Sequence, residues 1–173
     1  MTKDTRSNYL SGAEALVKLL DQNEVKYIFW LCGDTSLPFY DALYRLNHSI
    51  KHVLTRDERS ASYMADAYAR VTGKVGVCEG PSGGGATYII PGIVEANESS
   101  ISVISITSDV PTTSIGHFPL TELKQKELFN FNDSWFLFRN RRNDNLQQSI
   151  FERSFCFFQI KFGFLYNYIF SKW

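Results

Sequence analysis

The sequence predicts an α/β fold in which helices cover both faces of an open, parallel β-sheet. Between residues 11 and 107, short apolar runs alternate with longer segments whose apolar side chains recur every three or four positions. This alternation of strands and helices implies right-handed β–α–β crossovers and hence parallel strands. With 44% apolar and 21% charged side chains, the 173-residue chain also has the composition of an ordinary globular protein.

The first part of this pattern predicts two helices that flank a strand. Ser11 and Glu14 have the spacing of a capping box, which marks the start of a helix. The apolar run 27–31 is typical of a buried strand. After a polar turn, a second helix begins near Pro38, a residue favoured in the first helical turn. The predicted boundaries are helix 11–23, strand 27–31, turn 33–36 and helix 38–46.

The second part predicts three further strands that are separated by two helices. Asp57 is a favoured N-cap residue, and Gly73 stands where the helix that Asp57 begins has to end. A glycine-rich turn at 80–85 leads from the next strand into the last helix. The predicted boundaries are strand 52–55, helix 57–70, strand 75–79, helix 87–97 and strand 101–107.

A change of composition after Phe129 divides the chain into a domain, residues 1–129, and a tail, residues 130–173. The tail contains 14 aromatic side chains, ten of them Phe, and no Ala or Pro. Its net charge is +3 and that of the domain is −3, so the overall charge of zero is a cancellation. Translated AT-rich DNA has such a composition, and we expect a foreign or frame-shifted end of uncertain structure. A packing or interaction segment is the alternative.

Charge and cysteine usage argue against several classes of protein. A net charge of zero and a pI near 6.8 disfavour binding to nucleic acid or to a membrane surface. Cys32, Cys78 and Cys156 are odd in number and lack the spacing of a disulfide framework or of a metal site. The N-terminus lacks the apolar stretch of a signal peptide, so we expect a soluble, cytoplasmic protein.

Three polar segments follow predicted strands, at the edge where open parallel sheets bind their ligands. One of them belongs to the glycine-rich turn 80–85, which lies between a strand and a helix, where backbone amides can approach a ligand closely. This glycine-rich turn matches neither a phosphate-binding P-loop nor a dinucleotide fingerprint, so its pattern fits a ligand-free turn as well as a binding loop. The three segments are Gly33-Asp34-Thr35, Asp57-Glu58 and Pro81–Gly85.

Each candidate residue also has a purely structural interpretation. Asp57 and Glu58 suit a helix start, where Asp57 caps the helix and Glu58 faces the positive end of its dipole. Asp34 is typical of an Asx turn, and His117 of a loop. Ser82 lacks the Gly-x-Ser-x-Gly pattern of a serine hydrolase. Taken singly, these residues do not specify a function.

Taken together, the segments resemble the N-terminal, pyrimidine-binding domain of thiamine-diphosphate enzymes, in particular of the acetohydroxyacid (acetolactate) synthase-like branch. The third of the matching blocks is similar to the family's catalytic-glutamate helix, and the fourth to its Ser-Gly-Pro-Gly-Ala-Thr loop. The resemblance ends near Phe129, so it implies that the tail lies outside the family. In order, the matching blocks are Ser11–Leu16, Gly33–Pro38, Arg56–Arg70 and Gly80–Thr87.

The resemblance implies that thiamine diphosphate is the cofactor and that Glu58 is catalytic. In the family, a glutamate at this place hydrogen-bonds N1′ of the aminopyrimidine and favours the 4′-imino tautomer, whose nitrogen deprotonates thiazolium C2. Asp34 and His117 resemble groups that transfer protons in the pyruvate-decarboxylase branch. The cofactor-binding residues that the resemblance implies are Gly33, Asp34, Glu58, Ser82, Gly83 and Gly84.

The chain departs from the family pattern in two respects. Trp30 stands where the family usually has Gly, which predicts a local rearrangement. The Gly-Asp-Gly…Asn-Asn motif, with which a separate domain of the family holds the diphosphate and Mg²⁺, does not occur. We therefore expect Mg²⁺ only through that other domain, no metal ligand in this chain, and a Kd for thiamine diphosphate weaker than ~1 μM.

Two hypotheses for the function follow from the resemblance. In the first, the chain is a truncated piece of an enzyme that acts on 2-oxo acids and is inactive alone; carboligation of the acetolactate type is the first choice and decarboxylation the second. In the second, it is a catalytically silent binding or assembly module. Both predict a homo- or hetero-oligomer with a chain that carries the diphosphate-binding domain. The sequence does not name the substrate.

Overall fold

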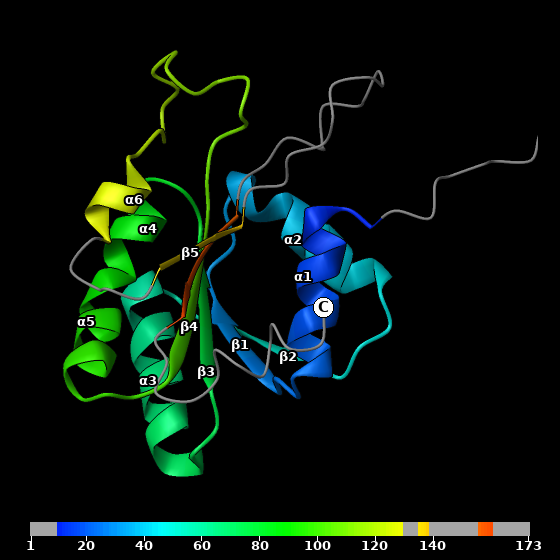
Figure 1. Ribbon diagram of the computed structural model, residues 1–173, viewed down its shortest axis with the longest axis vertical. Coiled ribbons are helices and arrows are strands. Elements are labelled where there is room, and N and C mark those ends of the chain that lie inside the picture. Colours follow the sequence, from blue (N-terminus) through cyan, green and yellow to red (C-terminus); the bar gives the residue numbers. More distant parts are fainter. Residues whose placement is uncertain (1–9, 130–134, 139–155, 161–173) are drawn as a thin grey trace, which may run out of the picture.

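The computed structural model describes residues 10–129, 135–138 and 156–160, and it confirms the predicted α/β fold. The elements follow one another nearly as predicted, with shifts of one to three residues at most boundaries (Figure 1). In chain order they are α1 (Gly12–Gln22), β1 (Tyr27–Trp30), η1 (Asp34–Ser36), α2 (Leu37–Arg45), β2 (Lys51–Leu54), α3 (Glu58–Thr72), β3 (Gly76–Gly80), α4 (Gly84–Tyr88), α5 (Ile90–Glu98), β4 (Val103–Ser108), α6 (Gln125–Leu128), β5 (Trp135–Phe138) and β6 (Cys156–Ile160).

The sheet has the strand order β2-β1-β3-β4-β6-β5. Its first four strands are parallel, as the alternation of elements predicts. The two strands of the tail extend the sheet in the antiparallel sense: β6 pairs with the outer edge of β4, with Ile160 opposite Ile104, and β5 pairs with β6. The open parallel sheet therefore ends at β4, and its edge is covered by backbone from the tail.

Helices cover both faces of the parallel sheet and create two apolar cores (Figure 1). On one face, α1 and α2 bury Leu16 and Phe39 against Ile28 and Val77 of the strands. On the opposite face, α3 and α5 pack against side chains that alternate with these, such as Cys78. Within the described ranges, every helix is too short or too polar to span a bilayer.

The predicted helix 87–97 is in fact two helices, α4 and α5. The break falls at Ile89, two residues before Pro91. A proline in the helix interior has no N–H to donate and clashes with the carbonyl four residues earlier, which here belongs to Thr87. In the first turn of a new helix neither cost arises, and Pro91 lies in the first turn of α5.

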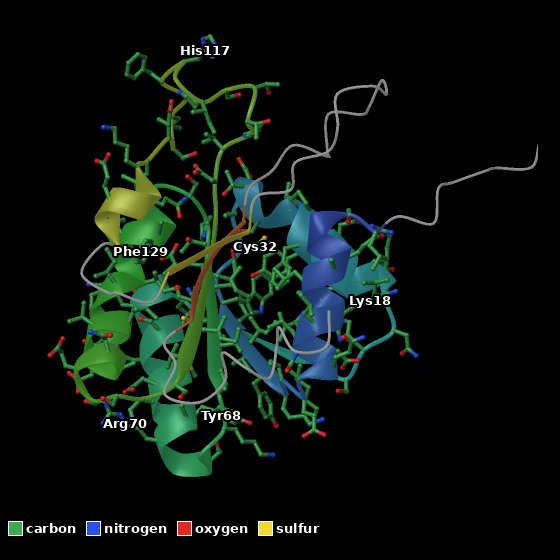
Figure 2. The ribbon with its side chains drawn as sticks, in the orientation of Figure 1. Lys18, Cys32, Tyr68, Arg70, His117 and Phe129 are labelled. Atoms are coloured by element: carbon green, nitrogen blue, oxygen red, sulfur yellow. The ribbon has the colours of Figure 1, made fainter. Side chains whose placement is uncertain are left out.

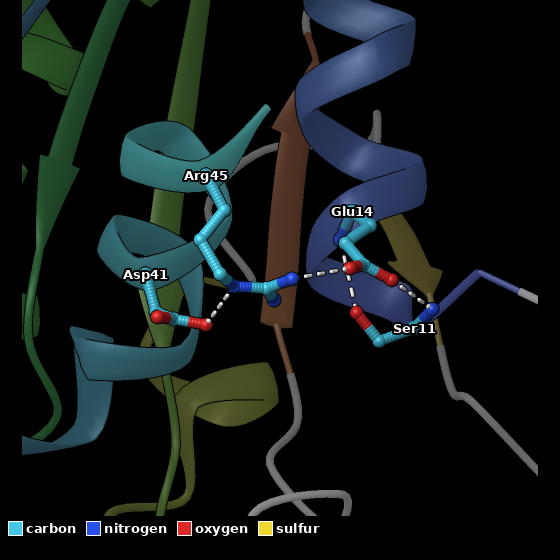
Figure 3. Close-up of polar contacts among 4 residues, drawn as sticks. All are labelled: Ser11, Glu14, Asp41 and Arg45. Carbon is cyan, nitrogen blue, oxygen red and sulfur yellow. Dashed lines mark hydrogen bonds and ion pairs between the residues drawn. The ribbon is translucent and has the colours of Figure 1, made fainter. Parts of the chain in front are cut away.

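A polar network joins the start of α1 to the end of α2 (Figure 3). The predicted capping box is present: Ser11 Oγ accepts from the Glu14 N–H at 3.2 Å, and Glu14 Oε2 accepts from the Ser11 N–H at 2.8 Å. The other carboxylate oxygen of Glu14 is 3.0 Å from Nη1 of Arg45, whose Nε donates to Asp41 at 2.7 Å. These contacts hold α1 and α2 side by side on one face of the sheet.

Candidate functional site

The chain leaves β1 and β3 toward opposite faces of the sheet, and this switch point lies at the C-terminal edge of the strands. β1 leads through η1 to α2, whereas β3 leads to α4 and α5 (Figure 1). Ligands of open parallel sheets bind at such points. The segments that follow the two strands meet here, since a Cβ built on Gly33 would lie 2.5 Å from Cβ of Pro81.

The segment Pro81–Gly85, which we call the glycine loop, is held by its own backbone and by Ser82. The Ser82 N–H donates to Oγ1 of Thr35 at 2.9 Å, and its hydroxyl donates to the carbonyl oxygen of Thr121 at 2.5 Å. Gly83 has φ +72°, which favours glycine, and the nearest atom to a Cβ there would be Thr121 Cβ at 3.1 Å. Ser82 is thus a structural anchor of the loop, which leaves the backbone to face a ligand.

Glu58 begins α3 and lies beside the glycine loop. Asp57 is the N-cap of this helix, as predicted, and its carboxylate accepts from the Arg59 backbone and guanidinium, contacts that lower the pKa of Asp57 to about 2. The half-buried Glu58 makes no hydrogen bond or ion pair within the described residues. A Cβ built on Gly85 would lie 3.3 Å from Glu58 Oε1, so glycine at this position leaves room next to the carboxylate.

The two residues predicted for proton transfer lie in different places. Asp34 is exposed at the start of η1, directly after Gly33 and therefore at the switch point. His117 is exposed at the tip of the loop between β4 and α6, and it points away from the rest of the described domain (Figure 2). The structure thus brings Gly33, Asp34, Glu58 and the glycine loop to one edge of the sheet and leaves His117 apart from them.

The structure adds Glu79, a residue that the sequence interpretation treated only as the end of a strand. Its side chain is 1% exposed, and it accepts hydrogen bonds from the hydroxyls of Ser36 and Tyr40. Burial, together with the negative charge of Glu58, raises the pKa of Glu79 to about 7 against the pull of these two donors. A buried carboxyl group at the ligand-binding edge is a functional candidate in its own right.

One signal in the sequence does point to Glu79. It is the acidic residue of a run that is otherwise small and apolar, 75–80, and β3 is buried along its whole length. Its two donors come from the i and i+4 positions of the segment that enters α2, a spacing that puts both on one side of a helix. Pairing Ser36 with Glu79 from sequence would, however, require the parallel register of β1 and β3.

Trp30 packs beside Glu79. The two residues are register partners on β1 and β3, and therefore lie on the same face of the sheet. The indole contacts the ring of Tyr40, with 4.2 Å between centroids. Its buried Nε1 has no hydrogen-bond partner among the described residues. Trp30 and Tyr40 thus form an aromatic layer on the α2 side of the sheet, and the rearrangement expected at Trp30 stays a prediction.

The edge fits an organic ring with hydrogen-bond donors better than a metal ion. Within the described ranges, no three His, Cys, Asp or Glu side chains gather in a way that could hold a metal. Glu58 instead offers a carboxylate beside the glycine loop, in which the exposed Gly84 lets a flat group approach the backbone, since only Tyr88 lies within 4 Å of a Cβ built there, at 3.8 Å. This arrangement suits a heterocycle whose ring nitrogen shares a proton with the carboxylate.

A comparison with known protein families identifies one whose model matches most of the chain. Residues 10–128 match the family model described as "Thiamine pyrophosphate enzyme, N-terminal TPP binding domain". The matched range includes every described helix and strand from α1 to α6 and ends just before Phe129.

Curated relatives also match over this range. The "Probable acetolactate synthase large subunit" of Methanococcus aeolicus is 42% identical over 120 residues, which are 69% of this chain and 20% of that protein. The "Acetolactate synthase large subunit" of Parasynechococcus marenigrum is 46% identical over 109 residues, or 62% of this chain and 18% of the relative. The corresponding protein of Corynebacterium glutamicum is 39% identical over 107 residues, 62% of this chain and 17% of its own. The chain thus spans at most about a fifth of the length of these relatives.

Proposed function

Because this chain belongs to the thiamine pyrophosphate enzyme family, as its N-terminal TPP-binding domain, we propose that Glu58 binds N1′ of the aminopyrimidine ring of thiamine diphosphate. The observation that carries the proposal is the open carboxylate of Glu58 at the edge of the sheet, beside Gly85 and without a hydrogen-bond partner among the described residues. A buried or partly buried carboxylate without a partner gains free energy from a donor that a ligand brings.

In this proposal the protein orients the ring, and Glu58 shares a proton with it. When bound, thiamine diphosphate supplies the carbanion chemistry that amino-acid side chains lack. The half-buried surroundings of Glu58 reduce competition from water, so that a proton on N1′ is held between the ring and the carboxylate. Glu58 is the first residue of α3, and the Asp57 cap sets the direction in which this helix begins. The cap therefore determines where the Glu58 side chain starts.

The remaining predicted contacts divide between backbone and side chain. We propose that Gly33, Gly83 and Gly84 contribute backbone that lies against the ring, and that Ser82 holds the glycine loop in place through Thr35 and Thr121. Asp34 lies at the switch point, whereas His117 does not, so Asp34 is the better placed of the two candidates for proton transfer to substrate. His117 requires a movement of its loop, or a binding partner, to reach the same edge.

We also propose that this domain is the N-terminal part of an acetolactate-synthase-like catalytic unit that acts on 2-oxo acids. The identity to acetolactate synthases over residues that include Glu58 and the glycine loop supports this. The diphosphate and Mg²⁺ would be held by a domain on another chain or another part of the enzyme. Decarboxylation instead of carboligation, and a silent assembly role, are outcomes that the experiment below distinguishes.

The test is complementation with Glu58→Gln as the variant. The chain is co-expressed with the Methanococcus aeolicus relative from which its own N-terminal domain has been deleted, and acetolactate and carbon dioxide are measured with a 2-oxo acid as substrate. We expect activity that Glu58→Gln lowers by roughly 10²–10⁴-fold, the usual contribution of a proton-transfer group. Glu24→Gln, at the opposite edge of the sheet, is the matched control and should change nothing.

Three results of this experiment would go against the proposal. Activity that Glu58→Gln leaves unchanged would exclude the catalytic role of this residue. A stable complex without product would favour the assembly module, and carbon dioxide without acetolactate would favour decarboxylation. Calorimetry of the chain alone with thiamine diphosphate should give a Kd weaker than ~1 μM, since the half of the site that holds the diphosphate is not supplied.

A further inference from the structure

A chain of hydroxyl groups connects the buried carboxyl of Glu79 to the glycine loop. Ser36 Oγ donates to Glu79 and lies 3.1 Å from Ser108 Oγ. Ser108 Oγ is in turn 2.7 Å from Thr35 Oγ1, which accepts from the N–H of Ser82 at 2.9 Å. The links join three neighbouring segments at the C-terminal edge of the sheet: η1, the end of β4 and the glycine loop.

The charge on Glu79 decides which way every hydroxyl in this chain points. A carboxylate only accepts, so the Ser36 hydroxyl must donate to it and can then only accept from Ser108. Ser108, having donated its one hydrogen to Ser36, must accept from Thr35, which in turn accepts from Ser82. With Glu79 charged, all donors from the glycine loop inward are therefore directed toward the carboxylate.

Protonation of Glu79 reverses part of this order. A carboxylic acid gains one O–H donor, and among the described residues the Glu79 carboxyl has only Ser36 and Tyr40 as hydrogen-bond partners. The new hydrogen therefore finds an acceptor only if one of these two hydrogen bonds turns round. Tyr40 has no other hydrogen-bond partner among the described residues and keeps Glu79 as its acceptor, whereas Ser36 Oγ also lies 3.1 Å from Ser108 Oγ. The Ser36 bond therefore reverses, Ser36 donates to Ser108, Ser108 donates to Thr35, and the oxygen that Ser82 uses has a second donor.

We propose that Glu79 is a positioning residue for the glycine loop, whose hydrogen bonding at Ser82 it controls through the hydroxyls of Ser36, Ser108 and Thr35. Nothing in this chain of contacts includes the carboxylate of Glu58. The functional consequence rests on the proposed function, because it is there that the glycine loop lies against the aminopyrimidine. The structural consequence, a change at Ser82 when Glu79 gains a proton, does not depend on any ligand.

Within the part of the chain that the structure describes, four titratable groups interact with Glu79: Tyr40 on α2, Cys32 after β1, Cys78 on the same strand and Glu58 on α3. Burial raises the pKa of both cysteines and of the tyrosine, which therefore keep their protons at neutral pH. Glu79, with a pKa of about 7, changes charge close to neutral pH. The reversal of the hydroxyl chain is therefore expected close to neutrality.

Two more distant groups need a control. His52 on β2 contacts the ring of Trp30, with 6.3 Å between centroids, and Asp34 acts on Cys32 through its charge. A histidine titrates in the same range as Glu79. The variants His52→Gln and Asp34→Asn therefore separate these groups from Glu79.

The experiment is a pH titration of the full chain, labelled with ¹³C and ¹⁵N and followed by NMR from about pH 5 to about pH 9. We expect the side-chain carboxyl carbon of Glu79 and the backbone amide of Ser82 to show one shared transition. In Glu79→Gln the Ser82 transition should be lost. In Ser36→Ala, which removes the first link only, Glu79 should still titrate while Ser82 no longer responds.

The controls His52→Gln and Asp34→Asn should retain the shared transition. A Ser82 transition that survives Glu79→Gln, a Ser82 amide that stays still while Glu79 titrates, or a Glu79 that does not titrate in this range would each overturn the inference. Glu58→Gln separates it from the proposed function: it should abolish complementation but keep the Ser82 transition, with a midpoint shifted downward because a neighbouring negative charge is gone.

Discussion

Among single residues, Glu79 makes the stability of the domain depend on pH. The pKa of Glu79 is about 7 in the folded chain and near 4.5 in the unfolded chain, so the folded state binds this proton more tightly. Its contribution to stability is complete below about pH 4.5 and is lost as the pH rises through about 7. The difference amounts to about 3 kcal/mol at ~1.4 kcal/mol per pKa unit.

We predict that Glu79→Gln is more stable than the wild type at a pH above 7 and differs little from it near pH 4.5, because the amide resembles the protonated acid. Urea unfolding at a series of pH values measures this, with Glu24→Gln as the control for the loss of an exposed carboxylate. If the urea concentration at the unfolding midpoint of the wild type does not decrease, relative to that of Glu79→Gln, as the pH rises from about 4.5 to above 7, Glu79 is not buried as described.

The residues of the site differ in how far sequence could predict them. The position of Glu58 can be predicted from sequence because a helix start is a local pattern, in which Asp57 and Glu58 occupy defined positions. The burial of Glu79 depends on Ser36 and Tyr40, which are about 40 positions away in the sequence, and so no local pattern contains it. His117 was predicted from its place in the chain alone, and the loop that carries it sets its distance from the other residues.

At the scale of one helix, the capping box of α1 is a discrete contribution to stability (Figure 3). Ser11→Ala removes the acceptor of the Glu14 N–H, and we predict a loss of about 1 kcal/mol of unfolding free energy. Ser11→Asp, which keeps an acceptor at the N-cap, should lose less. Chemical denaturation checks both, and equal losses in the two variants would show that the cap does not stabilise the domain.

The contact of α3 with α5 depends on a glycine. A Cβ on Gly92 would lie 2.4 Å from Ser62 Oγ and 2.7 Å from the backbone carbonyl carbon of the same residue. We predict that Gly92→Ala forces the helices apart and destabilises the domain by about 1–3 kcal/mol, the usual cost of overpacking. Gly84→Ala is the control, because only Tyr88 lies within 4 Å of a Cβ there, at 3.8 Å. Thermal unfolding should separate the two variants.

Elements were predictable wherever local chemistry determines them. The Ser11 cap and Gly73, which ends α3 with φ +67°, were both identified from residue type. The break between α4 and α5 is hidden in the apolar pattern, which continues through Ile89, and only Pro91 signals it. β5 and β6 were not predicted either, since antiparallel pairing to β4 is a contact between segments some 50 residues apart.

For the whole molecule, the edge of β4 is the place where the tail strands continue the sheet. A chain that ends at Phe129 would expose the backbone N–H and C=O groups of residues 104–108 that pair with β6. Unpaired edges of this kind are templates for association. We predict that the shortened chain self-associates in analytical ultracentrifugation, whereas a chain that ends at Ile160 and retains β5 and β6 behaves as the full chain does. Identical behaviour of the two would argue against this pairing.

The family and the architecture of residues 10–128 followed from the order of several short patterns, each weak alone. That order constrains topology because parallel β–α–β units have one handedness. The proposed change after Phe129 remains a prediction: the family match ends at residue 128, but nothing in the fold decides whether the tail is foreign to the domain.

The ring of Pro81 packs in space against two glycines, Gly33 and Gly85, and this packing has a consequence for protein engineering. Added Cβ atoms on Gly33 and Gly85 would lie 2.5 Å and 2.4 Å from its ring. Single-site mutagenesis at either glycine would therefore yield mostly misfolded clones. A combinatorial library that first replaces Pro81 with a smaller residue would make both positions available at once, and would reach loop variants that one-step directed evolution does not sample.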